Sequence, residues 1–301
     1  MSVNIRGLTK VYGKQRAVDN ISFTAKKGEI LGFIGPNGAG KSTTMKIITC
    51  FLSPTEGEVD VCGFDVSKSP DEVRKLIGYL PEHNPLYKDM YVKEFLHFIA
   101  KIHKIKNASI KVDEMIELTG LGVEQHKKIQ QLSKGYKQRV GLAQALIHDP
   151  EVLILDEHTS GLDPNQLAEI RALIKKISKD KVVIFSSHFM QEVEGLCDRV
   201  VLINKGQIIA DADLQDLIQK HSPENQYEVV FEKSVKKGDL SALRGIKKVS
   251  KTDDHSWLLV GENKVNVTAT ILQAAREHHW GIKEVKRHTM KLEEIFNKLT
   301  K

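Results

Sequence analysis

The sequence contains little cysteine. Its three cysteines, Cys50, Cys62 and Cys197, lie far apart along 301 residues. Their spacing fits no metal-binding pattern, and an odd number cannot complete a set of disulfides. We therefore expect a protein of the reduced cytosol, without a disulfide framework and without a cysteine-bound metal.

Long apolar runs are also absent. The most apolar segments, 152–155 and 182–185, have the length of strands and fall far short of the roughly 20 residues that span a bilayer. Residues 1–6 lack the apolar core of a secretory signal. The hydrophobic content of 41% and the charged content of 28% are typical of soluble globular proteins. We expect a chain that is neither secreted nor membrane-spanning.

Acidic residues do not balance the basic ones, so the net charge is +6 and the pI is near 9.0. This charge would permit contact with nucleic acid or anionic lipid. Lysines are scattered among acidic residues, however, which favours a solvated surface. We expect no nucleic-acid partner.

A glycine-rich segment lies between a predicted strand and a predicted helix. Residues 35–42 read Gly-Pro-Asn-Gly-Ala-Gly-Lys-Ser and fit the phosphate-loop pattern G-x-x-x-x-G-K-[ST]. Residues 29–34 are apolar, and residues 42–52 carry apolar side chains at helical spacing. A glycine-rich turn could match by chance, but this context favours a loop whose N–H groups and following helix bind phosphate.

The phosphate-loop pattern assigns roles to individual residues. Lys41 is expected to reach the β- and γ-phosphates of a nucleotide, and the hydroxyl of Ser42 is expected to bind Mg²⁺. The predicted nucleotide-binding residues of this loop are Gly35, Pro36, Asn37, Gly38, Ala39, Gly40, Lys41, Ser42 and Thr43.

Two acidic residues end a predicted strand. Residues 151–155 are followed by Asp156 and Glu157. Because burial up to Leu155 fixes the end of the strand, Asp156 is expected to emerge beside the phosphate loop and to hold Mg²⁺ directly or through water. Glu157 is placed to activate water as a general base. The alternative is that both acids only cap a helix.

A histidine follows the next predicted strand along the chain. The strand 182–186 is followed by Ser187 and His188. At that strand end an imidazole could contact both the γ-phosphate and the attacking water. A surface histidine without function is the alternative.

The order of predicted elements indicates an α/β fold with two domains. A β-rich part comes first, a helical stretch covers about residues 85–147, and strands then alternate with helices up to residue 203. This alternation predicts a parallel sheet with crossover helices. Residues 221–225 form a polar break, so we predict domains at 1–221 and 222–301. The second domain has the order βαββαβ plus one helix, which suggests a small ferredoxin-like α+β module that regulates or dimerises.

The segment Leu132-Ser133-Lys134-Gly135-Tyr136 precedes a predicted amphipathic helix over 140–147. It resembles the Leu-Ser-Gly-Gly-Gln signature of ABC transporter ATPases. The resemblance covers residues 3–220 and implies a P-loop ATPase that uses ATP and Mg²⁺. It also implies the following roles: Tyr12 stacks on adenine, Glu82 occupies the Q-loop position and binds the metal, Ser133 and Gly135 contact the nucleotide, Asp163 belongs to the D-loop, and His188 is the switch histidine.

Within this family the chain is most similar to exporter-type subunits. Residues 46–51 and 78–87 resemble the ATP-binding subunits of gliding-motility-associated transporters, and residues 292–296 match a C-terminal pattern of the exporter branch. The resemblance implies that two copies enclose two ATP molecules, with the phosphate loop of one facing Ser133 and Gly135 of the other. It also implies a separate integral membrane permease that contacts residues 85–98, and a peripheral position on the cytoplasmic face of the bacterial inner membrane.

Four residues depart from the family pattern. Lys134 and Tyr136 replace a glycine and a glutamine of the signature, Glu82 replaces the Q-loop glutamine, and His158 replaces a proline. An ATP-gated module of translation or DNA repair is a rival interpretation, but tandem ATPase units and long coiled coils are missing. A regulatory protein that binds ATP without turnover is a third, and the presence of Glu157 and His188 argues against it.

Overall fold

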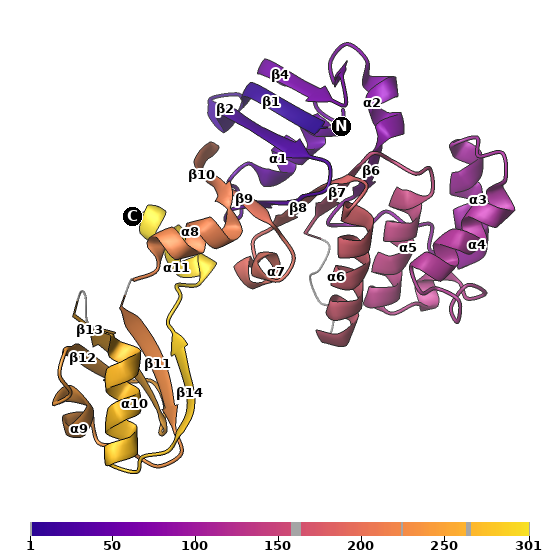
Figure 1. The fold of residues 1–301 in the computed structure, drawn as a ribbon. Helices are drawn as coiled ribbons and strands as arrows, with labels where there is room; N and C mark the ends of the chain where they lie inside the picture. The colour runs from indigo at the N-terminus through magenta and orange to yellow at the C-terminus, as the bar shows by residue number, and fades with distance from the viewer. Residues whose placement is uncertain (1, 158–163, 224, 263–265, 301) are drawn as a thin grey trace. The chain divides into compact units, whose positions relative to one another are not determined.

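The computed structural model describes residues 2–157, 164–223, 225–262 and 266–300. The chain forms two compact units, one ending at Leu214 and the other running from Gln215 to Leu299 (Figure 1). Helix α8 (Leu214–His221), which our predicted boundary assigns to the first domain, groups with the second unit. The functional domain limits therefore stay predictions.

A six-stranded sheet forms the centre of the first unit. Its strands are parallel except for β10, which pairs antiparallel with its neighbour. Three neighbouring inner strands, β3, β8 and β7, are fully buried, which explains their largely apolar sequences. In spatial order the strands are β10 (Gln207–Asp213), β9 (Arg199–Asn204), β3 (Ile30–Ile34), β8 (Val182–Ser187), β7 (Val152–Asp156) and β6 (Ile77–Leu80).

An antiparallel sheet shares its hydrophobic core with the central sheet. Helix α1 (Lys41–Ile48) contacts strands of both sheets, and its Met45, Ile47 and Ile48 are fully buried in this core. Packing on two sides therefore fixes α1 and the loop before it. The strands, in spatial order, are β2 (Gln15–Lys26), β1 (Ser2–Tyr12), β4 (Glu56–Val61) and β5 (Phe64–Asp65).

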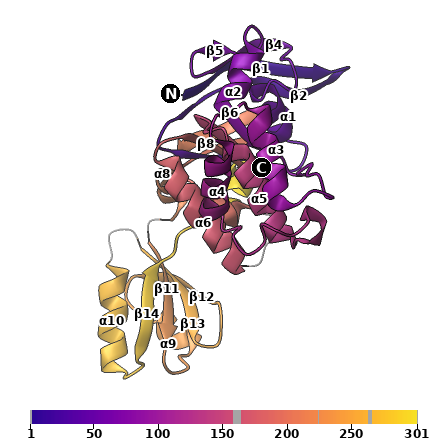
Figure 2. The same cartoon turned by 90° about the vertical axis from the view of Figure 1, so that its right-hand side faces the viewer.

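Three helices pack against one another as a helical subdomain (Figure 2). They are α3 (Val92–Ile102), α4 (Ala108–Leu118) and α5 (Lys134–Leu146). Helix α5 starts at Lys134, so the predicted start at residue 140 is wrong. The reason is that the Ser133 side chain caps the helix by accepting a hydrogen bond from the Tyr136 N–H. Helices α2 (Pro70–Leu76), α6 (Pro164–Ser178) and α7 (Met190–Glu194) and the 3₁₀ turn Ile129–Gln131 complete this unit.

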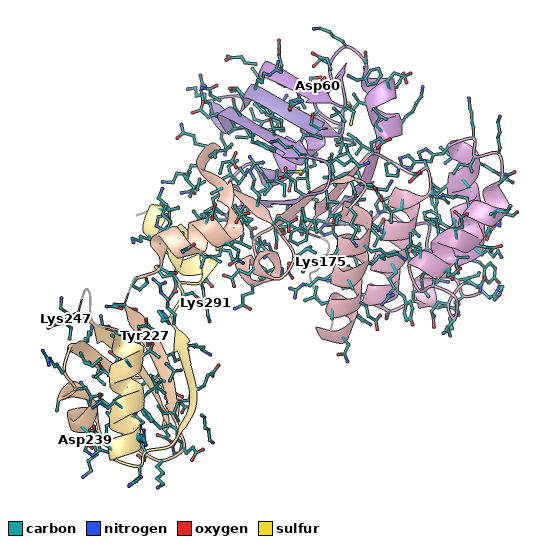
Figure 3. The ribbon with its side chains drawn as sticks, in the orientation of Figure 1. Asp60, Lys175, Tyr227, Asp239, Lys247 and Lys291 are labelled. Atoms are coloured by element: carbon teal, nitrogen blue, oxygen red, sulfur yellow. The ribbon has the colours of Figure 1, made fainter. Side chains whose placement is uncertain are left out.

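The second unit contains a four-stranded antiparallel sheet in the order β12–β13–β11–β14, which is the strand order of ferredoxin-like folds. Tyr227 lies near the start of β11 (Figure 3). Among the described residues, no helix is sufficiently long and apolar to cross a membrane. The elements are β11 (Gln226–Phe231), α9 (Lys237–Ser241), β12 (Ile246–Lys251), β13 (Ser256–Gly261), α10 (Val267–Glu277), β14 (Ile282–Arg287) and α11 (Leu292–Leu299).

Candidate active site

The phosphate loop curls tightly between β3 and α1. Gly40 has a φ of +112° at the N-cap of α1, and Gly38 has a φ of +77°. A Cβ atom on Gly40 would lie 2.6 Å from the carbonyl oxygen of Ala17, and one on Gly35 would overlap the carbonyl oxygen of Ile203. Gly40 is therefore required by backbone conformation and by space, and Gly35 is required by space alone.

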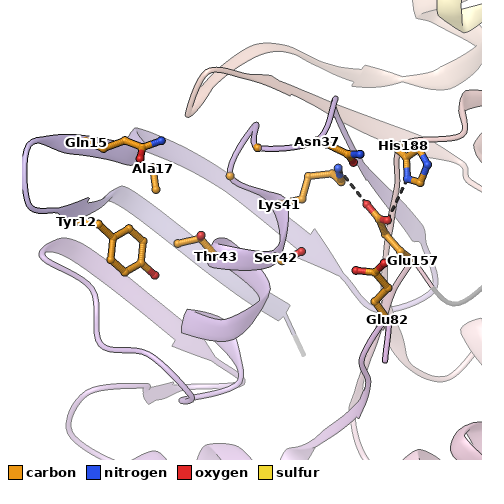
Figure 4. A pocket seen from close by; sticks show the side chains of 12 residues that line it. Tyr12, Gln15, Ala17, Asn37, Lys41, Ser42, Thr43, Glu82, Glu157 and His188 are labelled. Atoms are coloured by element: carbon orange, nitrogen blue, oxygen red, sulfur yellow. Dashed lines mark hydrogen bonds and ion pairs between the residues drawn. The ribbon is translucent and has the colours of Figure 1, made fainter. Parts of the chain in front are cut away.

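A cavity of about 470 Å³ opens above this loop (Figure 4). It collects side chains from the β1–β2 hairpin, the phosphate loop and the ends of three central strands. The lining residues are Tyr12, Gln15, Ala17, Asn37, Gly38, Gly40, Lys41, Ser42, Thr43, Glu82, Glu157 and His188.

Lys41 holds the loop and a catalytic candidate together. Its ammonium group is nearly buried, donates to the carbonyl oxygens of Gly35 at 2.8 Å and Pro36 at 3.2 Å, and forms an ion pair with Glu157 Oε1 at 3.2 Å. The predicted phosphate-binding lysine and the predicted general base are therefore direct neighbours.

Glu157 also contacts His188. Its Oε2 lies 3.0 Å from His188 Nδ1, and since a carboxylate only accepts, this bond places a proton on Nδ1. Glu157 has a φ of +48°, and its N–H donates to the carbonyl oxygen of Ser186 at 3.0 Å. The backbone turns sharply where β7 ends, which aims the side chain at the cavity. Lys41, Glu157 and His188 thus form one connected polar chain.

Asp156 lies beside the cavity but is not one of the described residues that line it. It is 3% exposed. The Ser186 hydroxyl donates to its Oδ1, and the Tyr79 hydroxyl donates to its Oδ2 at 3.4 Å. Burial and the charges of Asp156 and Glu82 raise the pKa of Tyr79, so the phenol remains a donor.

The residues beside the loop suit a magnesium ion bound together with phosphate. Ser42 and Glu82 offer oxygen atoms to the cavity and Asp156 lies next to it, and oxygen is the donor that Mg²⁺ prefers. Among the described residues, no cluster of three or more His, Cys, Asp or Glu could hold a metal ion.

Ser133 caps α5 and Gly135 lies in its first turn, and neither lines this cavity. A Cβ atom on Gly135 would overlap the Gln166 side chain, so the start of α5 is closely packed. The Lys134 side chain is exposed and forms no hydrogen bond or ion pair with the described part of the chain. The predicted D-loop residue Asp163 and the unusual His158 lie outside the described residues.

Other predicted residues fall at different places in the site. Tyr12 is 46% exposed at the hairpin end of the cavity, where it pairs with Gln15 across β1 and β2. Sequence reasoning missed Gln15 and Ala17; their nearness to Tyr12 along the chain is the signal that could have found them. Three predicted loop residues do not line the cavity: Gly35 and Pro36 accept hydrogen bonds from Lys41 through their carbonyl oxygens, and Ala39 is buried.

Comparison with known proteins places this site in a family. Residues 18–160 match the family model "ABC transporter". The linearmycin resistance ATP-binding protein of Bacillus subtilis is 32% identical over 97% of this chain and 96% of its own length. The chain belongs to the ABC transporter ATP-binding proteins. The bacitracin transport ATP-binding protein of Bacillus licheniformis is 39% identical over 71% of this chain and 70% of its own.

Solved structures agree with this membership. The dimeric structure of the ABC transporter cassette MJ0796 has a TM-score of 0.64 and 27% identity, and it covers 70% of this chain and 98% of the cassette. The same cassette, solved as a dimer in a post-hydrolysis state with ADP and Pi, has a TM-score of 0.65. This ABC ATP-binding protein therefore has the P-loop ATPase fold predicted from its sequence and is an ATPase.

Proposed function

We propose that this ABC ATPase is the motor subunit of an exporter and energises a separate integral membrane permease. The similarity to the linearmycin resistance protein extends through the second unit, and the bacitracin transport protein is also similar. Both names favour removal of an antimicrobial compound from the cell. The link to gliding motility predicted from residues 46–51 and 78–87 finds no support among these relatives.

The connected chain Lys41–Glu157–His188 carries the proposal, because it places a general base beside a phosphate-binding lysine. Phosphate oxygens of ATP would compete with Glu157 for Lys41, which would free the carboxylate to take a proton from water. His188 would orient Glu157 and contact the transferred phosphate.

Ser42, Glu82 and Asp156 would hold a magnesium ion on the nucleotide. When bound, Mg²⁺ supplies positive charge that neutralises the phosphates. Because Ser42 follows Lys41 on the first turn of α1, the hydroxyl and the lysine would approach neighbouring phosphate groups. Glu82 would add a carboxylate at the position where the family pattern described above has glutamine.

A homodimer would complete the site. Each chain has one phosphate loop and one signature segment, and Ser133 and Gly135 lie away from the cavity of their own chain. Pairing two copies head to tail would bring these residues to the nucleotide of the partner, and the dimeric MJ0796 cassette supports that arrangement.

The permease would dock on residues 85–98. Tyr87 is exposed and packs edge-on against Phe95 and Phe98, and an apolar hollow of about 590 Å³ includes Leu86, Met90 and Phe98. An apolar hollow with an exposed aromatic ring suits a partner helix. The chain would then sit peripherally on the cytoplasmic face of the bacterial inner membrane.

The substitution Glu157→Gln tests the proposal. It removes the general base, so ATP hydrolysis should fall about 10²- to 10⁴-fold. ATP binding should persist, because Lys41 and the loop remain, and the variant should accumulate as a dimer in size-exclusion chromatography with ATP and Mg²⁺. Glu117→Gln, on an exposed position of α4, is the control and should behave like the wild type. Near-normal hydrolysis, or a monomer under all conditions, contradicts the proposal.

A further inference from the structure

We propose that Tyr79 is a positioning residue of the ATPase reaction, whose hydroxyl fixes the orientation of Asp156. The inference rests on the proposed function, because it assigns Asp156 to the magnesium site. Tyr79 belongs to β6 and is not part of the phosphate loop, the signature segment or the cavity lining.

The carboxylate of Asp156 is held from both neighbouring strands. Strand β7 lies between β8 and β6 in the central sheet, and Asp156 is its last residue. Ser186 on β8 donates to Oδ1, and Tyr79 on β6 donates to Oδ2 at 3.4 Å. Each oxygen therefore faces one hydroxyl donor, with the longer contact on the Tyr79 side, and both donors come from the strands that flank β7.

The geometry of this arrangement is set by packing. Asp156 is 3% exposed, so bulk water has little access to replace a lost hydroxyl donor. Tyr79 pairs with Ile154 across the parallel β6–β7 ladder, and its ring packs against the shared hydrophobic core. Because the ring is held on that side, the phenol oxygen has little freedom to leave the carboxylate.

A fixed carboxylate matters for a hard cation. Mg²⁺ demands near-octahedral geometry and tolerates misplaced ligands poorly. With one lone pair of each oxygen engaged by a hydroxyl, the Asp156 carboxylate is held in one orientation and would offer its remaining lone pairs to a bound Mg²⁺ or its water. Groups that orient metal ligands typically contribute about 10- to 100-fold in metal affinity.

Tyr79 also connects Asp156 to Glu82. Glu82 lies three residues further along the chain and lines the cavity, and only Leu80 and Pro81 separate the two. A shift of the end of β6 would therefore move the hydroxyl that orients one proposed metal ligand together with the backbone that carries another. The two ligands would respond as a unit to displacement of this strand.

The test uses Tyr79→Phe, which removes the hydroxyl and keeps the ring. Binding of a fluorescent, non-hydrolysable ATP analogue would be measured in EDTA and during a MgCl₂ titration. We expect the affinity in EDTA to be unchanged and the Mg²⁺ concentration for half-maximal binding to rise about tenfold. Ser186→Ala, which removes the other hydroxyl donor, should raise the same Mg²⁺ concentration. Tyr227→Phe, at a partly buried tyrosine packed against the core of the second unit, is the matched control and should leave the Mg²⁺ concentration for half-maximal binding unchanged.

Several outcomes separate the interpretations. An unchanged Mg²⁺ midpoint for Tyr79→Phe overturns the positioning role. A second outcome would be that only Tyr79→Leu shifts the Mg²⁺ midpoint and that this variant also has a lower melting temperature in EDTA. Tyr79 would then act through packing, and the positioning role would be overturned as well. Asp156→Asn tests the underlying assignment: if it too leaves the Mg²⁺ titration unchanged, the magnesium site of the proposed function is wrong, independently of Tyr79.

Discussion

Two histidines stack on each other: His103 ends helix α3, and His148 lies two residues after the end of helix α5. The ring centroids of His103 and His148 are 4.1 Å apart and the planes differ by 3°. His148 Nε2 lies 3.1 Å from the carbonyl oxygen of Ile77, and Nδ1 is buried with no hydrogen-bond partner in the described part of the chain. Burial, followed by the charges of His103 and Lys181, lowers the pKa of His148 to about 4, against opposing effects of the Ile77 carbonyl and Asp149.

This lowered pKa predicts a loss of stability in mild acid. The unfolded chain binds a proton at His148 near pH 6.5, whereas the folded chain resists it until about pH 4. The free energy of unfolding should therefore be highest above pH 6.5 and decline as the pH falls toward 4, by about 2 kcal/mol for this half-buried group. In urea unfolding followed by circular dichroism, His148→Gln should flatten this decline. The control His126→Gln, at an exposed histidine, should keep the decline of the wild type. An equal dependence of the unfolding free energy on pH in the wild type and both variants would contradict the assignment to His148.

At the scale of whole elements, a glycine lets the segment after β6 rest on helix α5. A Cβ atom on Gly141 would overlap Nδ2 of Asn84 and lie 2.6 Å from Leu80 Cδ1. Gly141→Ala in an open helix would stabilise by up to about 1 kcal/mol. Here we expect no such gain and a destabilisation of about 1 kcal/mol instead, because the ends of the Asn84 and Leu80 side chains must shift. Thermal unfolding measures the change, and the double variant with Asn84→Ala should recover most of it. Gly238→Ala, on helix α9 with open space, is the control that should not destabilise.

The sequence predicted elements best where burial dictates their composition. The strands at 152–156 and 182–187 are buried on both faces, so their apolar runs were sufficient to find them. Helix α5 was predicted too short because its first turn carries exposed polar side chains, such as Lys134, and begins at a capping serine. Strand β10 was missed because its side chains are only partly buried. The contact between Tyr79 and Asp156 depends on which strands are neighbours, and no local pattern reports that.

At the scale of the whole molecule, the two units carry separate spectroscopic signals. The chain has two tryptophans, Trp257 and Trp280, and both belong to the second unit, where Trp257 lies in the core and Trp280 packs edge-on against Phe231. Tryptophan fluorescence therefore reports unfolding of the second unit alone. Circular dichroism reports both units, so ligand effects on either one can be told apart in the intact protein.

Binding of ATP should stabilise the first unit only. The cavity lies wholly between residues 12 and 188, and each unit has its own hydrophobic core. At 100 times the dissociation constant, a ligand adds about 2.7 kcal/mol to the stability of the unit that binds it. With ATP and Mg²⁺, the transition seen by circular dichroism should shift to higher urea while the fluorescence transition stays in place.

The fragment 1–221, which contains no tryptophan, should bind ATP with the affinity of the full chain. A folded fragment that does not bind ATP, or a fluorescence transition that shifts equally, would show that the second unit takes part in nucleotide binding.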